Sequence, residues 1–546
     1  MSADLTAYAV ELFIGSAWTN ITADVILAEE PMRFRYGLAG NSPLDRVADV
    51  GVWTFAVDNS TGNSAGTLGY YSPLHANVRT GFTYGIPARV SLTYGGVTYY
   101  KFRGRIRDIE PVPGLYRQRI TRITVVDWME QAAIQQVRGV SLQLSQRSDQ
   151  VFAMVLADIP IQPAAALISA GRDTFTYALD NLGGDRVAAT SLFQDIAQSE
   201  LGFIYVRGDT IQGETLVFEN RQTRMATTTN SLSLNDDMLE IRVPSSLETI
   251  VNRVEVVIAS RAIDATATTV LFSLPTPQSA AIAGNDTITL WGDYRDPAGK
   301  ATWVGGTAMV APVATTDYTM NTAADGSGSD LTANCTVRAT YFASAVKLTI
   351  TNGDAGAFNP ATFTSATFNT ASATPSTPAA GYLTKVQCRG KGLYRYDPET
   401  FRSDETVSQS TYGLRPTTIP MTYQDSHAVA QGAADYLAHL YSNPLAQVDA
   451  VIFEANASAA LLTAALARDI SDRIGIDETV TGVTQTTSGM DRGWYINSVE
   501  FEVGPGRLGP QITCTWGLAP SDATAFWLLE TVGASELNTT TRLGYI

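Results

Sequence analysis

Few side chains in this sequence are of the types that usually carry out chemistry. It has three histidines, His75, His427 and His439. His427 and His439 are twelve positions apart on one predicted helix, so they cannot share a metal ion at a single helical turn. Asp435 and His439 are spaced i,i+4, which we interpret as a hydrogen bond or weak ion pair rather than a catalytic dyad.

The cysteines do not form a recognisable site either. Cys335, Cys388 and Cys514 are odd in number and far apart, which matches neither a disulfide framework nor a zinc pattern. No histidine follows Cys514, which disfavours a cysteine peptidase with its base after the nucleophile. We therefore expect three buried thiols that act as small apolar side chains.

No motif predicts a catalytic or metal site. The sequence has no Gly-x-Ser-x-Gly elbow, His-Glu-x-x-His helix or Walker loop. The acidic stretch from Asp325 to Asp330 lacks EF-hand spacing and the closing glutamate, so we interpret it as a hairpin turn rather than a calcium site. Glu200, at the end of a predicted helix, is expected to be a solvated cap. The sequence predicts no enzyme activity, no cofactor and no bound metal.

Five residues are candidates for a surface contact. Tyr70 and Tyr71 lie in a loop rich in Gly, Ser and Tyr, which would suit a sugar platform but more often packs on its own domain or on a neighbouring subunit. Arg103, Arg105 and Arg107 alternate along a predicted strand, so their side chains share one face. We interpret that charged face as a subunit contact.

Size and charge narrow the class of protein. A chain of 546 residues predicts about three to five domains. Charged residues make up only 16%, and the net charge is −16 with a pI near 4.7. This acidic balance argues against tight binding to a phosphate backbone. The N-terminus has no pattern of a signal peptide, and no apolar run approaches the ~20 residues of a membrane span. We expect a soluble protein made in the cytoplasm.

The predicted elements are mainly strands, with helices in the second and fourth quarters. The run from Val52 to Asn59 alternates apolar and polar residues, and Gly95-Gly96 joins two strands in a tight hairpin. A helix from about 192 to 201 has Thr190-Ser191 as its predicted N-cap and Gly202 as its C′ residue.

We predict a multidomain, mainly β fold with α+β parts. The predicted domains are a barrel-like β domain (1–140), an α+β domain (141–260), an inserted β-sandwich rich in Thr, Ala, Ser and Gly (261–385) with a flexible linker at 373–380, a domain with a helix at 425–441 and closing strands (386–520), and a C-terminal tail (521–546).

Several short stretches, in order, resemble the tail-tip (baseplate hub, or minor tail) proteins of long-tailed bacteriophages. They are Phe55-Ala56-Val57-Asp58-Asn59, Gly69-Tyr70-Tyr71-Ser72-Pro73-Leu74, Phe102-Arg103-Gly104-Arg105-Ile106, Phe193-Gln194-Asp195-Ile196-Ala197, Leu216-Val217-Phe218-Glu219-Asn220-Arg221, Tyr294-Arg295-Asp296-Pro297, Arg389-Gly390-Lys391-Gly392-Leu393-Tyr394 and Thr540-Thr541-Arg542-Leu543-Gly544. The resemblance covers most of the chain, although each piece is short and divergent.

The resemblance implies a structural virion protein. In that family a homotrimer closes the distal end of the tail tube, and two barrel-like domains per chain form a pseudo-sixfold ring. Here residues 1–140 and part of 386–520 would be those domains. The implied partners are the tail tube or distal tail protein and the tail fibre or tip proteins, and the implied location is the tail tip. DNA would pass through during infection without specific binding.

Two other classes remain open. A receptor- or glycan-binding adhesin would use the 261–385 module and the Tyr70–Tyr71 loop, and binding of host-surface glycans by that module would favour it. A glycan-cleaving tail enzyme would need a carboxylate pair, for which no sequence signature exists. Release of reducing ends, lost on one Glu or Asp substitution, would establish that class.

Overall fold

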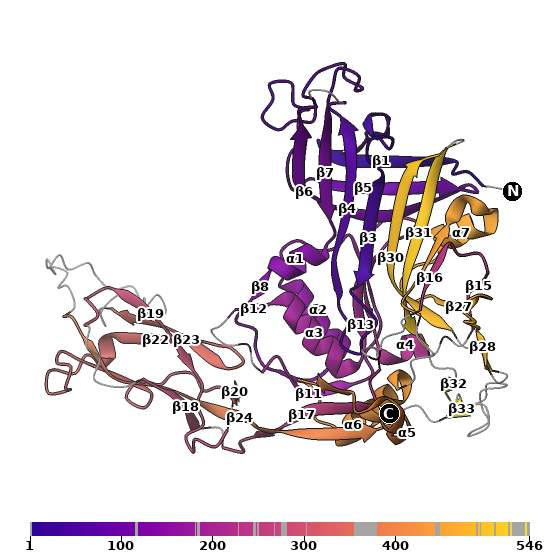
Figure 1. Ribbon diagram of the computed structural model, residues 1–546. Coiled ribbons are helices and arrows are strands. Elements are labelled where there is room, and N and C mark those ends of the chain that lie inside the picture. The colour runs from indigo at the N-terminus through magenta and orange to yellow at the C-terminus, as the bar shows by residue number, and fades with distance from the viewer. Residues whose placement is uncertain are drawn as a thin grey trace.

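A computed structural model describes residues 3–114, 118–180, 182, 186–225, 227, 229–243, 247, 250–266, 268–274, 281–301, 303–353, 379–442, 448–487, 490–491, 493–506, 509–521, 525–526 and 541–542. The fold is mainly β, with several sheets and a smaller helical part, which confirms the predicted class. Figure 1 shows an upright part built from strands of both chain ends and an arm that extends sideways from its base.

One sheet of thirteen strands dominates the upright part. Along its main path the strand order is β16-β26-β31-β30-β3-β4-β7-β6-β5-β1-β2, and β27 pairs with β30 and with β15. The strands are β1 (Ala7–Ile14), β2 (Ala17–Asn20), β3 (Met32–Leu38), β4 (Ala48–Asp58), β5 (Pro87–Tyr94), β6 (Val97–Val112), β7 (Ile120–Val126), β15 (Leu232–Asn235), β16 (Glu240–Arg242), β26 (Ala450–Glu454), β27 (Arg473–Asp477), β30 (Trp494–Pro505) and β31 (Pro510–Pro520).

The two ends of the chain share this sheet through β3 and β30. They pair antiparallel with Phe34 opposite Phe501, and the two rings stack with centroids 5.1 Å apart. The predicted first and fourth domains are therefore joined by a continuous hydrogen-bonded ladder. The domain boundaries themselves stay predictions.

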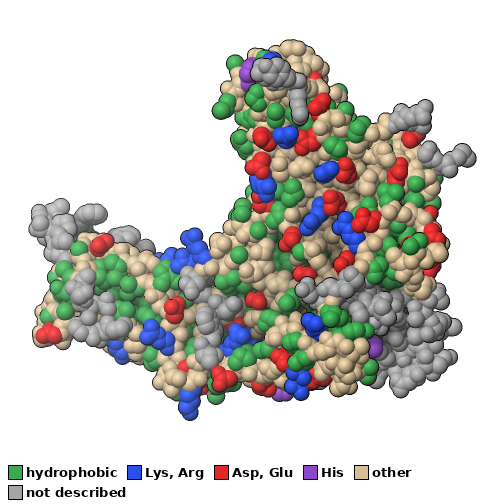
Figure 2. Space-filling view, viewed as in Figure 1, with side chains coloured by type: hydrophobic (Ala, Val, Ile, Leu, Met, Phe, Trp, Pro, Cys, Tyr) green, Lys and Arg blue, Asp and Glu red, His purple; other side chains and the backbone are tan. Residues whose placement is uncertain are grey.

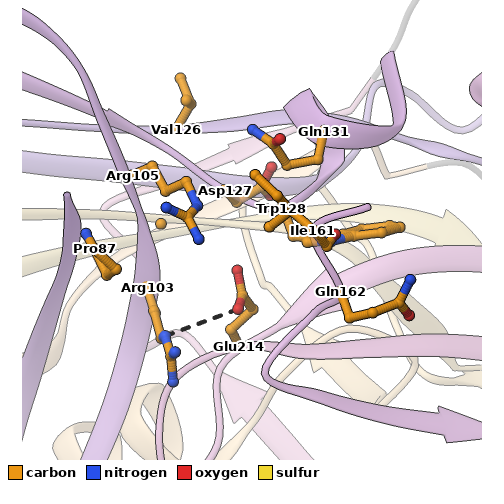
Figure 3. A pocket seen from close by; sticks show the side chains of 11 residues that line it. Pro87, Arg103, Arg105, Val126, Asp127, Trp128, Gln131, Ile161, Gln162 and Glu214 are labelled. Carbon is orange, nitrogen blue, oxygen red and sulfur yellow. Dashed lines mark hydrogen bonds and ion pairs between the residues drawn. The ribbon is translucent and has the colours of Figure 1, made fainter. Parts of the chain in front are cut away.

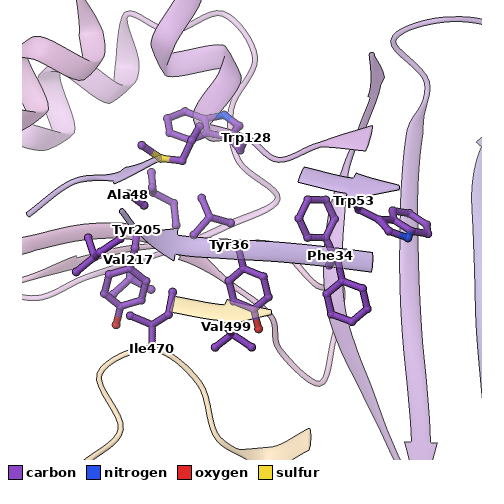
Figure 4. Close-up of a cluster of buried hydrophobic side chains, with 14 of the residues drawn as sticks. Phe34, Tyr36, Ala48, Trp53, Trp128, Tyr205, Val217, Ile470 and Val499 are labelled. Atoms are coloured by element: carbon purple, nitrogen blue, oxygen red, sulfur yellow. The ribbon is translucent and has the colours of Figure 1, made fainter. Parts of the chain in front are cut away.

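The sheet curls strongly around its core. Three strand steps separate β3 from β6, which would be about 14 Å in a flat sheet. Yet the Phe34 ring on β3 lies only 6.3 Å from the Phe102 ring on β6, and Trp53 on β4 lies 6.0 Å from the same ring. Figure 4 shows Phe34 and Trp53 among these buried side chains. The path stays open, so the described strands form no closed barrel.

A helical layer lies below the main sheet. It contains α1 (Met129–Ile134), α2 (Ser148–Ala157), α3 (Ala189–Glu200) and α4 (Arg221–Met225), with small sheets formed by β8 (Gln136–Val137) and β12 (Val187–Ala188), by β9 (Gln143–Arg147) and β11 (Thr174–Ala178), and by β10 (Ala165–Ile168), β14 (Thr215–Glu219) and β13 (Phe203–Arg207). α2 packs on α3, and the Phe152 and Phe193 rings lie 4.9 Å apart.

The predicted start of α3 is wrong, whereas Gly202 follows the C-cap Leu201 and is the C′ residue, as predicted. The helix starts at Ala189, with Ala188 as N-cap and no side-chain cap bond, so Thr190 and Ser191 lie inside it. At its C-terminus Leu201, rather than Gly202, takes the left-handed conformation with φ 55°. Gly202 is needed for another reason, since a Cβ there would lie 2.3 Å from the Glu219 carbonyl oxygen.

A ribbon of two long strands connects this layer to the arm. β17 (Arg253–Ile263) pairs with the far end of β24 (Tyr382–Asp404) and with β25 (Pro416–Pro420). Helix α6 (His427–Tyr441) covers them, with Ser426 as its N-cap, which confirms the predicted helix. Its apolar face is formed by Val429, Ala433 and Leu437, which are buried, and by Leu440, which is partly buried. The short helix α5 (Thr406–Tyr412) follows β24.

The arm has a hydrophobic core of its own, and the predicted sandwich domain at 261–385 stays a prediction. One sheet is β19-β23-β22, and the other pairs β18, β20 and β21 with the near half of β24. The bounds are β18 (Thr269–Ser273), β19 (Thr287–Asp293), β20 (Trp303–Thr307), β21 (Tyr318–Asn321), β22 (Cys335–Tyr341) and β23 (Ala345–Asn352). β24 runs through the predicted boundary at 385. The predicted linker at 373–380 lies largely outside the described residues.

The remaining elements are short. They are α7 (Ala459–Ala467), β28 (Thr486–Thr487), β29 (Met490–Asp491), β32 (Ala525–Phe526), β33 (Thr541–Arg542) and the 3₁₀ turns Thr22–Asp24, Thr332–Asn334 and Ala455–Ala457. The Gly95-Gly96 hairpin is confirmed, with positive φ at both glycines. All three cysteines are buried and free, also as predicted.

Candidate functional site

Arg103 and Arg105 line a small, partly open pocket between the main sheet and the helical layer (Figure 3). The space in it that water molecules can occupy has a volume of about 40 Å³. The lining residues are Pro87, Arg103, Gly104, Arg105, Val126, Asp127, Trp128, Gln131, Ile161, Gln162 and Glu214. The strand period places both arginines on one face of β6, and the start of α1 places Asp127 and Trp128 beside them.

Two buried carboxyl groups face this pocket. Glu214 accepts a hydrogen bond from the Ala164 amide, and its Oε2 lies 3.8 Å from Arg103 Nε. Asp127 accepts one from the Met129 amide, at 3.0 Å. Gly51 is required next to it, because a Cβ there would lie 2.4 Å from Asp127 Oδ2. Sequence analysis missed both carboxyl groups; the only local sign is that each one borders an apolar strand.

Burial controls the protonation of these groups. Burial raises the pKa of Asp127 to about 7, against the lowering effect of two backbone amides and with a smaller contribution from the Glu214 charge. Burial also raises the pKa of Glu214, which Arg103 partly offsets. Burial lowers the pKa of Arg103 in turn. Paired carboxyl groups with raised pKa values are typical of acid–base sites. This pocket, however, has room for about one water molecule and none for a sugar ring.

Arg107 does not join the pocket. A bulge in β6 between Ile106 and Asp108 falls at its position, and its exposed side chain pairs with Asp108 at 2.9 Å. Arg105 donates to the Gly85 carbonyl oxygen. All three arginines are thus engaged within the chain, and a subunit contact for the three residues stays a prediction.

The two tyrosines lie in different environments. Tyr71 is fully buried, its hydroxyl donates to Asp24 at 2.5 Å, and burial raises its pKa strongly. It therefore packs on its own sheet and cannot act as a sugar platform. Tyr70 is half-buried, with the Arg79 guanidinium 5.5 Å from its ring centre. A role for Tyr70 at a subunit contact stays a prediction.

Glu200 is not a solvated cap. Its side chain is fully buried and accepts hydrogen bonds from the Ser148 hydroxyl and from the Arg172 and Asp173 amides. Arg221 pairs with Asp173 and lies 3.9 Å from Glu200. Burial and the Asp173 charge raise the pKa of Glu200. These partners come from three separate segments, so no local pattern reveals the network.

A second, larger hollow lies on the main sheet where β3, β30, β31 and β26 meet. Its volume is about 400 Å³, and its lining includes Arg35, Arg242, Asp449 and Glu500. Gly37 and Gly517 lie against Ser498, which lines the hollow. A Cβ at either glycine would collide with Ser498. Charges of both signs line this groove, so it does not select a ligand of one charge.

The described part of the chain also bears on metal and membrane binding. There, no group of three or more His, Cys, Asp or Glu side chains could hold a metal ion. Among the helices of that part, none is long and apolar enough to cross a membrane. The loop at Asp325 is a turn, as predicted. The Asp325 carboxylate accepts hydrogen bonds from the Ser327 amide and hydroxyl.

No protein-family model and no curated protein matches this chain. Several solved structures are similar to it, and three of them are described here. The prophage MuSo2 43 kDa tail protein from Shewanella oneidensis has a TM-score of 0.42 and 10% identity, over 93% of this chain and 96% of that one. A tail protein from Neisseria meningitidis MC58 has a TM-score of 0.40 and 9% identity, over 94% and 97%.

The third is the E. coli c3393 protein, described as a type VI secretion component with structural similarity to the T4 tail proteins gp27 and gp5. It has a TM-score of 0.35 and 10% identity, over 96% of this chain and 88% of that one. Because all three TM-scores are below 0.5, no functional argument is based on them.

Proposed function

We propose that this chain is a structural subunit of a phage tail tip, three copies of which close the distal end of the tail tube. The proposal combines the sequence resemblance with one structural observation. Both ends of the chain build a single thirteen-stranded sheet whose path is open at β2 and at β16. A subunit of this kind is suited to assembly, because open sheet edges are usually covered in a stable protein.

Both edges carry exposed apolar side chains. Leu239 and Val243 flank β16 and are 66% and 38% exposed. At the other edge Phe13 is 37% exposed and packs against Trp18 of β2 at 5.3 Å. Apolar residues beside an unpaired strand favour association. Because the two edges differ, joining one to the other is a head-to-tail contact, which closes into a ring where each contact rotates the next subunit by a third of a turn.

Light scattering after size exclusion tests the proposal. We expect a mass near three times the 58.5 kDa chain. Leu239→Asp should convert the trimer to a monomer because it places a charge at the covered edge. Ile134→Asp is the matched control, since Ile134 is 64% exposed on α1, away from both edges. A chain that stays monomeric at every concentration and does not bind purified tail tubes would contradict the proposal.

In the assembled tail the trimer would contact the tail tube or distal tail protein on one side and fibre or tip proteins on the other. The chain would be made in the host cytoplasm and incorporated at the tail tip. Its net charge of −16 suits a conduit for DNA, because a negative wall repels the duplex and prevents specific binding. Replacing the acidic residues that face the threefold axis by amides should slow DNA ejection. Unchanged ejection kinetics would contradict a conduit role.

The arm supports a second candidate function, the binding of a host-surface glycan. It has its own core and projects from the upright part (Figure 1). Strand β22 exposes Thr336, Arg338 and Thr340, and Lys347 lies beside Thr340 on β23. A glycan array with the full chain tests this function. Signals that disappear in Arg338→Ala/Lys347→Ala, but persist with the exposed Lys300→Ala, would support it.

A further inference from the structure

The arm joins the rest of the protein, here called the body, through a ribbon with a bend. The ribbon is the pair β17–β24, and its register shifts between Ala259 and Arg261. A β-bulge of this kind bends a strand and turns a side chain to a new direction. Here the side chain is Arg261, which reaches into the body instead of lying along the ribbon.

Arg261 fixes the ribbon to the body at this bend. Its Nε lies 2.7 Å from Asp180 Oδ2, and it donates to the Thr422 carbonyl oxygen. The Arg261 and Asp180 side chains are 0% and 1% exposed. Buried, charge-assisted pairs of this type are strong and geometrically specific. We call this contact the pivot.

A second contact connects the arm to the body farther along the chain. The Arg138 guanidinium lies 4.0 Å from the Trp291 ring centre, and Phe342 stacks on the same ring at 5.2 Å and 14°. The Ala343 amide donates to the Val140 carbonyl oxygen at 2.9 Å. We call this contact, between residues 138–140 and Trp291, Phe342 and Ala343, the latch.

Gly139 lets the latch form. Its φ is +70°, and a Cβ at this position would lie 2.8 Å from Phe342 Cε1. Any side chain at Gly139 would therefore strain the backbone and push the Phe342 ring away. In Figure 1 the strands β19 and β23 of the arm lie next to β8 and β12 of the body, and in Figure 2 Lys and Arg side chains gather at this corner.

The two contacts differ in strength. The pivot is buried, whereas Arg138 is exposed and Trp291 is 37% exposed. An exposed cation–π contact changes an equilibrium only about two- to fivefold. The latch also includes the buried Ala343 and its backbone hydrogen bond to Val140, so opening it exposes one small apolar side chain as well. Units of one chain move relative to one another by default unless the interface between them is large and apolar. The latch can therefore open while the pivot holds.

We propose that the arm is a lever that swings about the bulge at Arg261 and is held against the body by the latch. The open state keeps the Arg261–Asp180 pair and the core of the arm, and it exposes Trp291 and Phe342. The proposal does not depend on a tail function, because it follows from the contacts within one chain.

Distances between two spin labels on the full chain test the lever. Thr336→Cys in β22 labels the arm, and Val97→Cys in β6 labels the body, since both side chains are exposed. The three native thiols are buried and leave the labels specific. We expect one main distance in the wild type and a longer one in a minor population. Arg138→Ala should increase the ratio of the longer population about two- to fivefold.

Two further variants separate the latch from general destabilisation. Gly139→Val should open the latch without removing any of its side chains, and Arg138→Ala/Trp291→Ala should open it further than Arg138→Ala alone. Arg338→Ala, an exposed arginine on the same sheet of the arm, should leave the distances as in the wild type. A single unchanged distance in Arg138→Ala and in the double variant would overturn the lever. An Arg338→Ala effect as large as that of Arg138→Ala would also overturn it.

Discussion

Lys101 Nζ lies 3.1 Å from Asp469 Oδ2, and the two residues are 368 positions apart in the chain. Lys101 is 3% exposed, and its ammonium group also faces the Leu466 and Arg468 carbonyl oxygens at the end of α7. Tyr36 donates to the same Asp469 oxygen from β3. This contact joins the N-terminal strands of the main sheet to the C-terminal part of the chain.

Removing the ammonium group should be costly. Lys101→Ala leaves Asp469 buried without its cation, and breaking a buried pair in this way typically costs about 3–5 kcal/mol. Arg107→Ala is the control, because Arg107 and Asp108 form an exposed pair that is worth about 1 kcal/mol or less. Urea denaturation of both variants measures the difference. Equal midpoints for the two variants would show that the buried pair contributes little to stability.

Asp127 should make the stability of the fold depend on pH. Its pKa is about 7 in the folded state, against an ordinary value of 3.8, so the folded state binds the proton more tightly. The stability that this proton contributes is complete below about pH 4 and is lost as the pH rises through 7. The full difference is about 4 kcal/mol. Glu214 and Glu130 act in the same direction.

Urea midpoints of the wild type and Asp127→Asn at about pH 5 and pH 8 measure this effect. The asparagine carbonyl can still accept from the Met129 amide, so the local geometry is retained. We expect the variant to lose less stability than the wild type between the two pH values. The same loss in both proteins would mean that Asp127 does not titrate in this range.

The Glu200 network predicts a difference between two substitutions at one position. Glu200→Ala leaves the Ser148 hydroxyl and the Arg172 and Asp173 amides without their acceptor. At about 1–3 kcal/mol for each unsatisfied group, the loss should be at least about 3 kcal/mol. Glu200→Gln keeps an acceptor and removes a buried charge whose pKa is raised, so its cost should be smaller.

Thermal melting of both variants compares these costs. Glu110→Ala is the control, because the Glu110 side chain is 70% exposed and lies 3.9 Å from Arg122. It should melt within a degree or two of the wild type. If Glu200→Ala has the same melting temperature as Glu110→Ala, the network does not stabilise the fold.

Local patterns predicted the elements whose cause is local. The hairpin at Gly95-Gly96 needs two residues with positive φ, and α6 has both an apolar stripe and a serine N-cap. The pairing of Phe34 with Phe501 has no local cause, because many strands have the same alternation and only tertiary contacts select the partner.

The residues of the candidate site could likewise be predicted only where a local pattern specifies them. Arg103 and Arg105 were found because alternation along one strand is a local pattern. Asp127 and Glu214 were missed, since the environment of a carboxyl group depends on which distant segments cover it. Glu200 was expected in solvent for that reason. Tyr71 was a candidate for a surface contact, but Asp24, 47 positions away, binds its hydroxyl inside the core.

The cysteines give the simplest test of the core. Burial raises the pKa of Cys335 to about 11 and that of Cys388 to about 12, and it raises the pKa of Cys514 further. Only the thiolate reacts with a disulfide reagent, so the native protein should not react at about pH 8. All three thiols should react once concentrated guanidinium chloride unfolds the chain.

Thr336→Cys is the positive control, because its exposed thiol should react at once in the native protein. Rapid reaction of a native thiol in the wild type would mean that the segment around it opens, and the position of that thiol would identify whether the arm or the main sheet is the part that opens.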